Sequence, residues 1–248
     1  MIVSGAPAAK PARSVAPGEP IRILGPPPRF VGRGGEKLDA ALERFGIEVE
    51  GRRALDAGAS TGGFTDCLLQ RGAVEVVAVD VGHGQLHERL RADPRVVNRE
   101  RTNVRSVEPG AFGGTFPIVV ADLSFISLRT VLPALLGQAD PGADLVLLVK
   151  PQFEAGRAEV SRGRGVVADP EIWRRTVDDV QVACLDAGAA IMGAMVSPLR
   201  GADGNVEFLL HVAAPDPVSG SGANRRALGD DELDRLVAVA VDGAPEPT

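Results

Sequence analysis

Acidic residues and one lysine stand where predicted strands end, and their side chains are the first that could do chemistry. Asp56, Asp80 and Asp122 close or follow short apolar runs, and Lys150 ends the apolar stretch DLVLLVK. Because the carboxyl ends of parallel strands share one edge of a sheet, we expect the four side chains to line that edge. A carboxylate there can accept hydrogen bonds from both hydroxyls of a ribose. Asp80 is the candidate for this contact, and a turn or helix-capping aspartate is the alternative.

The stretch LDAGASTGGFTDCLLQRGA joins the first of these strands to a predicted helix through a glycine-rich loop. Free backbone N–H groups and the positive end of a helix dipole meet at such a loop, so it favours a nucleotide-like ligand. Its spacing differs from the GxGxxG of dinucleotide-binding proteins, and no phosphate-binding lysine follows it. The loop therefore predicts a nucleotide-like ligand, although it matches neither the dinucleotide-binding motif nor the phosphate-binding motif that ends in a lysine.

These residues need a sheet to position them, and the chain has alternating apolar runs and helical patterns. Residues 38–45 carry apolar side chains at helical spacing before Gly46, and a longer helix is predicted over 170–187. The strand candidates are RRALDAG, VEVVAVD, PRVVNRE, PIVVADL, ADLVLLVK, AAIMGAMVS and NVEFLLHVA. This alternation predicts an α/β, Rossmann-like fold: a mostly parallel, seven-stranded sheet with a terminal antiparallel hairpin.

Length and composition favour a single main domain. The chain has 248 residues, of which 44% are hydrophobic, enough for one sizeable core. It has neither a run of about 18 apolar residues nor the apolar block of a secretory signal, so we expect a soluble, cytoplasmic protein with no membrane role. Cys67 and Cys184 lie outside any CxxC pattern, which predicts reduced, buried thiols. His83 and His87 lack a nearby third ligand, so no metal site is predicted.

Charge is distributed unevenly along the chain, although the net charge is −6 at pH 7. Residues 1–37 carry six basic and two acidic side chains, whereas residues 216–248 carry three basic and seven acidic ones. A basic front end could meet phosphates while the acidic tail stays in solvent, and ordinary solvated surface is the alternative. The balance argues against a uniformly basic nucleic-acid binder but allows RNA contact by one end.

Four blocks in order, LDAGASTGGFT, ADLSFISL, LVKPQFEAG and SPLRGADGNVEF, resemble the TlyA family, also called hemolysin A, of FtsJ-like rRNA ribose 2′-O-methyltransferases. The resemblance runs from about Phe30 to Ala213. It implies a class I methyltransferase fold, S-adenosylmethionine as cofactor at the glycine loop, and a ribose of ribosomal RNA, alone or in ribosomal subunits, as the substrate, with cytidine suggested. The residues implied for cofactor binding are Asp56, Gly58, Ser60, Thr61, Gly62, Gly63, Phe64, Asp80 and Asp122.

The same resemblance implies a catalytic tetrad, matched by Lys37 in GRGGEKL, Asp122 in ADLSFIS, Lys150 in LVKPQF and Glu207 in GNVEF. A ribose hydroxyl is a poor nucleophile, so methyl transfer needs a base and in-line positioning. A lysine can be that base if burial and a second ammonium lower its pKa, and Lys37 would supply the second charge. The two acids would orient the amines. Taken singly, Lys37 also fits a surface helix and Glu207 an exposed strand position.

Three aromatic residues fall in or beside the matched blocks. Phe64, Phe125 and Phe153 could contact adenine or a target base, and a place in the apolar core is the alternative for each.

The front end departs from the family pattern, in which an N-terminal S4 RNA-binding domain precedes the methyltransferase domain. Residues 1–28 resemble only the last strands of that domain, and a disordered Pro/Ala-rich leader is the alternative. We therefore expect a methyltransferase domain at 29–213 and an acidic tail, able to form a short helix, at 214–248. The alternative function is a non-catalytic RNA-binding or ribosome-associated protein that keeps the cofactor fold. The oligomeric state is left open.

Overall fold

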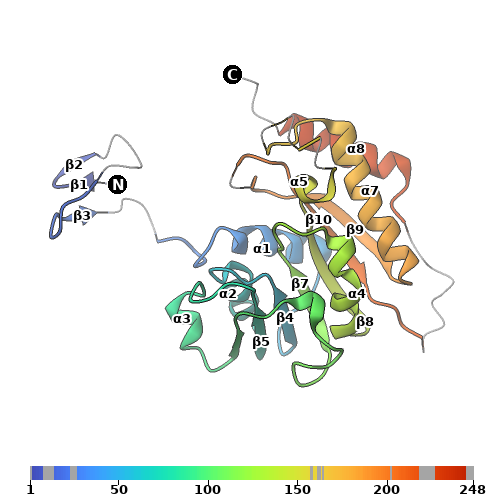
Figure 1. Cartoon of the computed structure of the whole chain (residues 1–248), viewed down its shortest axis with the longest axis horizontal. Helices are drawn as coiled ribbons and strands as arrows, with labels where there is room; N and C mark the ends of the chain where they lie inside the picture. The colour runs from blue at the N-terminus through green and yellow to red at the C-terminus, as the bar shows by residue number, and fades with distance from the viewer. Residues whose placement is uncertain are drawn as a thin grey trace.

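The structure is a computed structural model of the whole chain (Figure 1). A seven-stranded sheet with helices on both faces forms the main body, and a three-stranded sheet forms near the N-terminus. The residues that the structure describes are 2–7, 14–22, 27–156, 159–160, 163, 165–201, 203–217 and 227–243.

The main sheet has the strand order β6, β5, β4, β7, β8, β10, β9. Neighbouring strands are parallel except around β10, which is antiparallel to both β8 and β9. The predicted α/β fold with a mostly parallel seven-stranded sheet is therefore confirmed. Its strands are β4 (Arg53–Ala57), β5 (Glu75–Val79), β6 (Val96–Arg99), β7 (Phe116–Ala121), β8 (Ala139–Val149), β9 (Ala190–Val196) and β10 (Phe208–Ala213).

Side chains along each central strand alternate between two apolar cores. In β4, Ala54 packs into one core and Leu55 into the other, and Val76 and Val77 divide in the same way in β5. Successive side chains of a strand point to opposite faces of the sheet, so both faces need apolar residues. This explains why the strands read as continuous apolar runs rather than as an alternating pattern.

Helices cover both faces of this sheet (Figure 1). Helices α1, α2 and α3 contribute buried side chains to one core, and α4, α7 and α8 contribute to the other. The helices are α1 (Gly34–Phe45), α2 (Gly63–Gln70), α3 (Glu88–Arg91), α4 (Leu128–Gln138), α5 (Pro151–Glu154), α7 (Pro170–Asp186) and α8 (Asp230–Asp242), with a 3-10 turn η1 (Val104–Ser106).

The acidic end of the chain differs from the prediction that it stays in solvent. Helix α8 has 13 residues, and its side chains Leu233, Leu236 and Ala240 are buried in the core shared with α7. Its acidic residues face outward, where Asp230 and Asp234 form ion pairs with Arg174 of α7. This end of the chain does not stay wholly in solvent, because one face of the helix is apolar at helical spacing and packs into the core.

Near the N-terminus, three short strands form a small antiparallel sheet in the order β2, β1, β3. They are β1 (Ile2–Val3), β2 (Ala6–Pro7) and β3 (Ile21–Arg22). Figure 1 draws this sheet beside the main body, connected to it by the segment that leads into α1. An RNA-binding role for residues 1–28 stays a prediction.

Among the described residues, no helix is both long enough and apolar enough to cross a membrane. Both cysteines are free and buried, as predicted for Cys67 and Cys184.

Candidate active site

The glycine loop between β4 and α2 approaches other parts of the protein so closely that side chains would collide with them. A Cβ atom on Gly58 would lie 2.3 Å from the backbone oxygen of Asp122, and one on Gly62 would lie 2.1 Å from Leu90 Cδ1. Both glycines also have positive φ, at 89° and 97°, where other residues are strained. These two glycines are therefore required by contacts within the chain, before any ligand is considered.

Asp80, directly after β5, shapes this loop through its carboxylate. Its Oδ2 accepts a hydrogen bond of 2.8 Å from the backbone N–H of Ser60, and its Oδ1 accepts one of 2.6 Å from Gly82. Ser60 has a φ of 47°, an unusual conformation for a residue other than glycine. Asp80 thus holds Ser60 in place and still lines a cavity at the sheet edge.

Asp56 lies behind the loop, fully buried at the end of β4. Its Oδ2 accepts a 2.6 Å hydrogen bond from the Thr65 hydroxyl, while its Oδ1 is buried without a hydrogen-bond partner among the described residues. Burial raises the pKa of Asp56 to about 7, and the negative charges of Asp122 and Asp80 act in the same direction. Asp56 is close enough to influence the site electrostatically but is not among the residues that line its cavities.

The first predicted lysine–acid pair lies at the ends of two neighbouring strands. Asp122 follows β7, Lys150 follows β8, and Lys150 Nζ is 2.6 Å from Asp122 Oδ1. Lys150 Nζ also donates a 3.0 Å hydrogen bond to Ser124 Oγ. The Lys150 side chain is 11% exposed and that of Asp122 is 23% exposed. The lysine of this pair is therefore almost buried, whereas its aspartate partly contacts solvent.

The second pair joins residues that lie 170 positions apart in the chain, Lys37 in the first turns of α1 and Glu207 directly before β10. Lys37 Nζ donates to Glu207 Oε2, and both side chains are at most 10% exposed. A Cβ on Gly201 would lie 2.7 Å from Glu207 Oε1, so the loop before β10 packs closely over this carboxylate. Lys37 is therefore not a surface lysine, and Glu207 is not an exposed strand residue. The two residues form a buried ion pair.

Three of the four predicted catalytic residues line one cavity of about 320 Å³, and the fourth is ion-paired with one of the three. Lys37, Asp122 and Lys150 line it, and Glu207 lies behind Lys37. Its full lining is Arg33, Gly34, Lys37, Gly58, Ala59, Ser60, Thr61, Gly63, Phe64, Asp122, Ser124 and Lys150.

A second cavity of about 420 Å³ adjoins the first, and the two share Gly58, Ser60, Asp122 and Ser124. We name the smaller one the catalytic cavity and the larger one the nucleoside cavity. The nucleoside cavity is lined by Gly58, Ser60, Val79, Asp80, Val81, Gln85, Thr102, Asn103, Val104, Asp122, Leu123, Ser124, Phe125, Ile126 and Val131. Most of these residues stand at the carboxyl ends of β4, β5, β6 and β7, where a ligand of a doubly wound sheet is expected.

The three aromatic candidates have different surroundings. Phe64 is 3% exposed and belongs to an apolar core, whereas Phe125 is 91% exposed and lines the nucleoside cavity. The rings of Phe125 and Phe153 lie 5.2 Å apart, and Phe125 has a φ of 63°. A backbone strained in this way, with its ring left in solvent, suggests a site for a partner rather than a core position.

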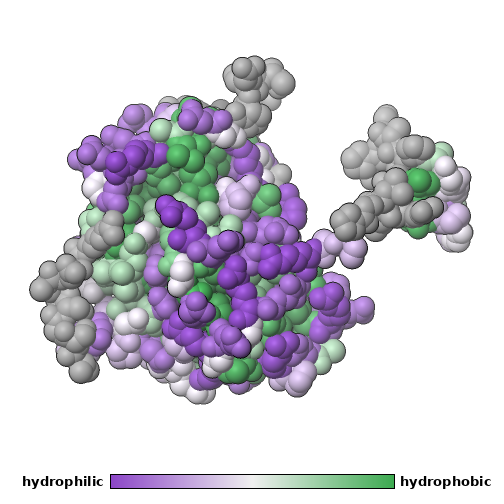
Figure 2. Space-filling view, turned by 180° about the vertical axis from the view of Figure 1, so that it is seen from behind, coloured by the Kyte–Doolittle hydropathy of each residue, from purple (hydrophilic) through white to green (hydrophobic). Residues whose placement is uncertain are grey.

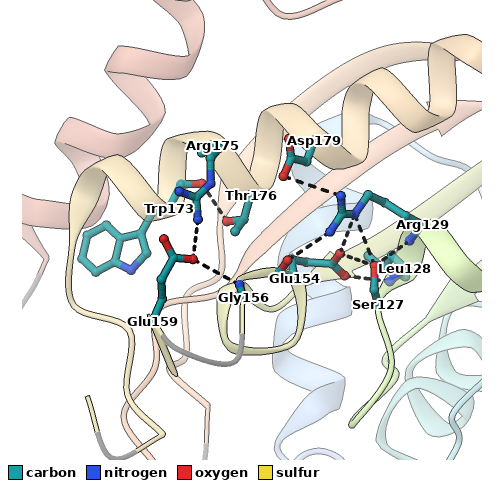
Figure 3. Close-up of polar contacts among 10 residues, drawn as sticks. All are labelled: Ser127, Leu128, Arg129, Glu154, Gly156, Glu159, Trp173, Arg175, Thr176 and Asp179. Atoms are coloured by element: carbon teal, nitrogen blue, oxygen red, sulfur yellow. Dashed lines mark hydrogen bonds and ion pairs between the residues drawn. The ribbon is translucent and has the colours of Figure 1, made fainter. Parts of the chain in front are cut away.

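A buried carboxylate, Glu154, ties the segment after β8 to the start of α4, after the loop that follows β7 (Figure 3). It accepts hydrogen bonds from the Ser127 hydroxyl at 2.5 Å and from the Leu128 backbone N–H at 2.7 Å, at the start of α4. Arg129 adds an ion pair at 3.4 Å and reaches Asp179 in α7 at 3.7 Å. The segment after β8 and the loop after β7 are therefore held as one unit. Burial raises the pKa of Glu154.

Several site residues were not identified from the sequence, namely Arg33, Gln85, Asn103 and Ser124. Ser124 had a usable signal, because it stands two residues after the strand-ending Asp122. The other three lie in turns or at a helix start, where no periodicity marks the direction of a side chain.

A larger cavity of about 710 Å³ lies elsewhere, between the end of α1, strand β9 and helix α8. Figure 2 views the molecule from behind and shows apolar residues gathered in the upper part of that face. Met192 and Val239, both exposed, line this cavity. None of the predicted site residues is among the described residues that line it.

The chain matches one family model and is similar to several known proteins. The model of a family described as FtsJ-like methyltransferase matches residues 30–214. The 16S/23S rRNA (cytidine-2′-O)-methyltransferase TlyA of Mycobacterium tuberculosis is 54% identical over 209 residues, covering 84% of this chain and 78% of that protein. Hemolysin A of Brachyspira hyodysenteriae is 42% identical, covering 74% of this chain and 76% of that protein. A solved structure from Streptococcus thermophilus has a TM-score of 0.84 and 39% identity, covering 96% of this chain and 84% of that one.

Proposed function

Because the chain belongs to the FtsJ-like methyltransferase family, we propose that it transfers the methyl group of S-adenosylmethionine to a ribose 2′-hydroxyl of ribosomal RNA, on a cytidine. The observation that carries this proposal is the meeting of Lys37, Asp122 and Lys150 around a cavity that shares four lining residues with a second, larger one. The choice of ribosomal RNA and of cytidine rests on the printed names of relatives, including the 23S rRNA (cytidine-2′-O)-methyltransferase TlyA of Campylobacter jejuni.

The residues present fit S-adenosylmethionine on three counts. Asp80 offers a carboxylate to ribose hydroxyls in the nucleoside cavity, and the loop from Gly58 to Phe64 borders both cavities. Asp56 supports the loop from behind, because its Oδ2 accepts a hydrogen bond from Thr65 in α2, the helix that follows the loop. When bound, the cofactor supplies an electrophilic methyl group on a sulfonium. We assign the predicted cofactor residues to this role, with Asp56 behind the loop rather than at the cavity wall.

Lys150 is the group best placed to receive the proton of the ribose hydroxyl. Its amine is largely buried, borders the catalytic cavity and has Lys37 across that same cavity. In its neutral form this amine can accept the proton as the oxygen attacks. Asp122 orients the Lys150 amine, and Glu207 compensates the charge of Lys37.

An RNA substrate needs positive charge near the site, although the chain as a whole is acidic. Arg33, Arg99, Arg101 and Arg105 are exposed and have no ion pair within the described part of the chain. Arg33 borders the catalytic cavity, and the other three flank the nucleoside-cavity residues Thr102 to Val104 in sequence. Arginines without an acidic partner are available for phosphates. The exposed ring of Phe125 adds a surface on which a base can stack.

The proposal is tested with purified protein, radiolabelled S-adenosylmethionine and ribosomal RNA, either naked or in 30S and 50S subunits. We expect label in RNA, recovered after digestion as 2′-O-methylcytidine. The Lys150→Ala chain is the matched control for background transfer. Label on a base, or RNA binding without transfer, would contradict the proposal, and the second result would favour the non-catalytic RNA-binding alternative.

The same preparation tests the arginine surface. Replacing Arg101 and Arg105 by alanine should weaken RNA binding at low salt and reduce the slope of log affinity against log salt by about 2. Cofactor affinity, measured by calorimetry, should not change. Arg95, which forms an exposed ion pair with Asp93, provides the matched control substitution.

A further inference from the structure

The amine of Lys150 has two polar partners among the described residues. One is Asp122 Oδ1 at 2.6 Å, and the other is Ser124 Oγ at 3.0 Å. Ser124 borders both the catalytic cavity and the nucleoside cavity, so its hydroxyl stands where the two meet.

The number of these partners matters for a lysine that acts as a base. A charged lysine amine has three N–H donors, whereas a neutral one has two N–H donors and one lone pair. When the neutral amine of Lys150 donates one hydrogen bond to Asp122 and one to Ser124, its lone pair is left for a group in the catalytic cavity. With only Asp122 as a partner, the amine could rotate and the lone pair would have no fixed direction.

From this geometry we infer that Ser124 is a positioning residue, which directs the lone pair of Lys150 at the hydroxyl that is to be methylated. The inference rests on the proposed function. In the step it serves, the hydroxyl oxygen forms a bond to the methyl carbon while the carbon–sulfur bond breaks. The sulfur keeps that electron pair and leaves as a thioether, and the hydroxyl proton passes to Lys150 Nζ.

Both ends of the short loop that carries Ser124 are anchored, which keeps its hydroxyl in place. At one end, the backbone N–H of Asp122 donates a 3.0 Å hydrogen bond to Ala57 in β4. At the other end, Ser127 and Leu128 donate to the buried carboxylate of Glu154 (Figure 3). Glu154 lies four residues after Lys150, so the same unit holds the amine and its partner. A positioning group must be fixed in this way to have an effect on rate.

The experiment measures single-turnover methylation of ribosomal RNA from pH 6 to pH 10 for the wild type, Ser124→Ala and Ser124→Thr. A hydroxyl oxygen that accepts a hydrogen bond stabilises the ammonium more than the neutral amine. Losing it should favour the neutral amine, so the rising limb of the rate profile moves to lower pH. The plateau rate should fall by about tenfold or more, because the lone pair loses its direction. Threonine keeps the hydroxyl and should restore both features.

Ser127→Ala is the matched control: it removes a hydroxyl that bonds Glu154 instead of Lys150, while the Leu128 N–H bond still anchors the loop to Glu154. The other charged groups around the amine, Asp122, Lys37 and Arg33, are unchanged in both variants. Ser127→Ala can lower stability and rate but should leave the position of the rising limb where the wild type has it.

The outcomes separate the inference from the proposed function. A Ser124→Ala profile identical to that of the wild type, or a lower plateau with an unmoved limb, would overturn the positioning role. A lower plateau with an unmoved rising limb would mean that Ser124 has a structural role only. Absence of transfer by the wild type would overturn the proposed function and the inference with it.

Discussion

The two lysine–acid pairs at the site differ in how they meet the cavities. In the Lys150 pair, the partner Asp122 is 23% exposed and lines both cavities. In the Lys37 pair, the partner Glu207 is 3% exposed and is not among the described residues that line either cavity. A partly exposed ion pair can exchange its partner for a substrate group. In a buried ion pair both residues stay charged, because leaving one buried charge without its partner costs much free energy. The same pair of residue types can thus provide a base in one place and a fixed charge in another.

Substituting the two lysines gives the largest expected effect and separates the two roles. Lys150→Ala should lower the single-turnover rate by about 10²- to 10⁴-fold with little change in cofactor affinity. Lys150→Arg should fail nearly as badly, since a guanidinium does not deprotonate near neutral pH. Lys37→Arg keeps a positive charge and should retain more of the rate. Near-normal activity of Lys150→Arg would show that this lysine is also a fixed charge, and the contrast between the pairs would disappear.

Substituting Glu207 and Asp122, the two acids of these pairs, should lower stability to different extents. Glu207→Gln leaves the ammonium of Lys37 buried without its counter-charge, so it should lower the free energy of unfolding by about 3 to 5 kcal/mol. Asp122→Asn should cost less, because Asp122 is partly solvated and Lys150 keeps Ser124 as a partner. Urea unfolding at pH 7 measures both variants. Equal losses would mean that the two pairs are equally sealed.

Asp56 extends the comparison to a buried carboxylate that has no cation partner among the described residues. Its pKa is raised to about 7 by burial, whereas a carboxyl of this kind in an unfolded chain titrates near about 3.9. Between these values the folded chain holds a proton that the unfolded chain has released. The free energy of unfolding should therefore fall as pH rises from about 4 to about 7, by on the order of 2 to 4 kcal/mol.

Asp56→Asn removes this titration and should flatten that part of the pH profile. Asparagine keeps an oxygen that can accept the hydrogen bond from Thr65. Urea unfolding of the two proteins at several pH values measures the difference between them. A constant difference from pH 4 to pH 8 would mean that Asp56 is already charged in the folded protein.

Substituting Asp80 should give the smallest of these effects, and it tests whether the nucleoside cavity binds the cofactor. Asp80→Ala should weaken S-adenosylmethionine binding by about 1.5 to 3 kcal/mol, through lost ribose hydrogen bonds and release of the Ser60 backbone. Asp80→Asn keeps one acceptor oxygen and should lie between the wild type and alanine. Calorimetry gives the dissociation constants, and an unchanged value in a folded Asp80→Ala chain would remove this residue from the cofactor site.

Much of the site edge could be predicted because strand ends are local features. Asp80, Asp122 and Lys150 each close an apolar run, and parallel strands bring their carboxyl ends to one edge of the sheet. The family resemblance, confirmed by the match over residues 30–214, added Lys37 and Glu207. Their individual roles, and those of the predicted cofactor residues, stay predictions until the substitutions above are measured.

Local sequence patterns could not predict why the loop has glycine at Gly58 and Gly62. The sequence suggested that a ligand must approach the backbone of this loop. In the structure, the atoms that would collide with a side chain on Gly58 or Gly62 belong to the chain itself, to Asp122 and Leu90. Such contacts depend on segments far away in sequence, so no motif spacing reveals them.

The sequence by itself determined the class of fold, because the period of apolar residues decides which segments become strands and helices and which faces they bury. Only the tertiary structure decided that Lys37 meets Glu207, that Ser124 meets Lys150, and that the acidic helix α8 packs on α7. The physical reason is that periodicity acts over a few residues, whereas burial of an ion pair or of a helix face depends on what the completed sheet brings against it.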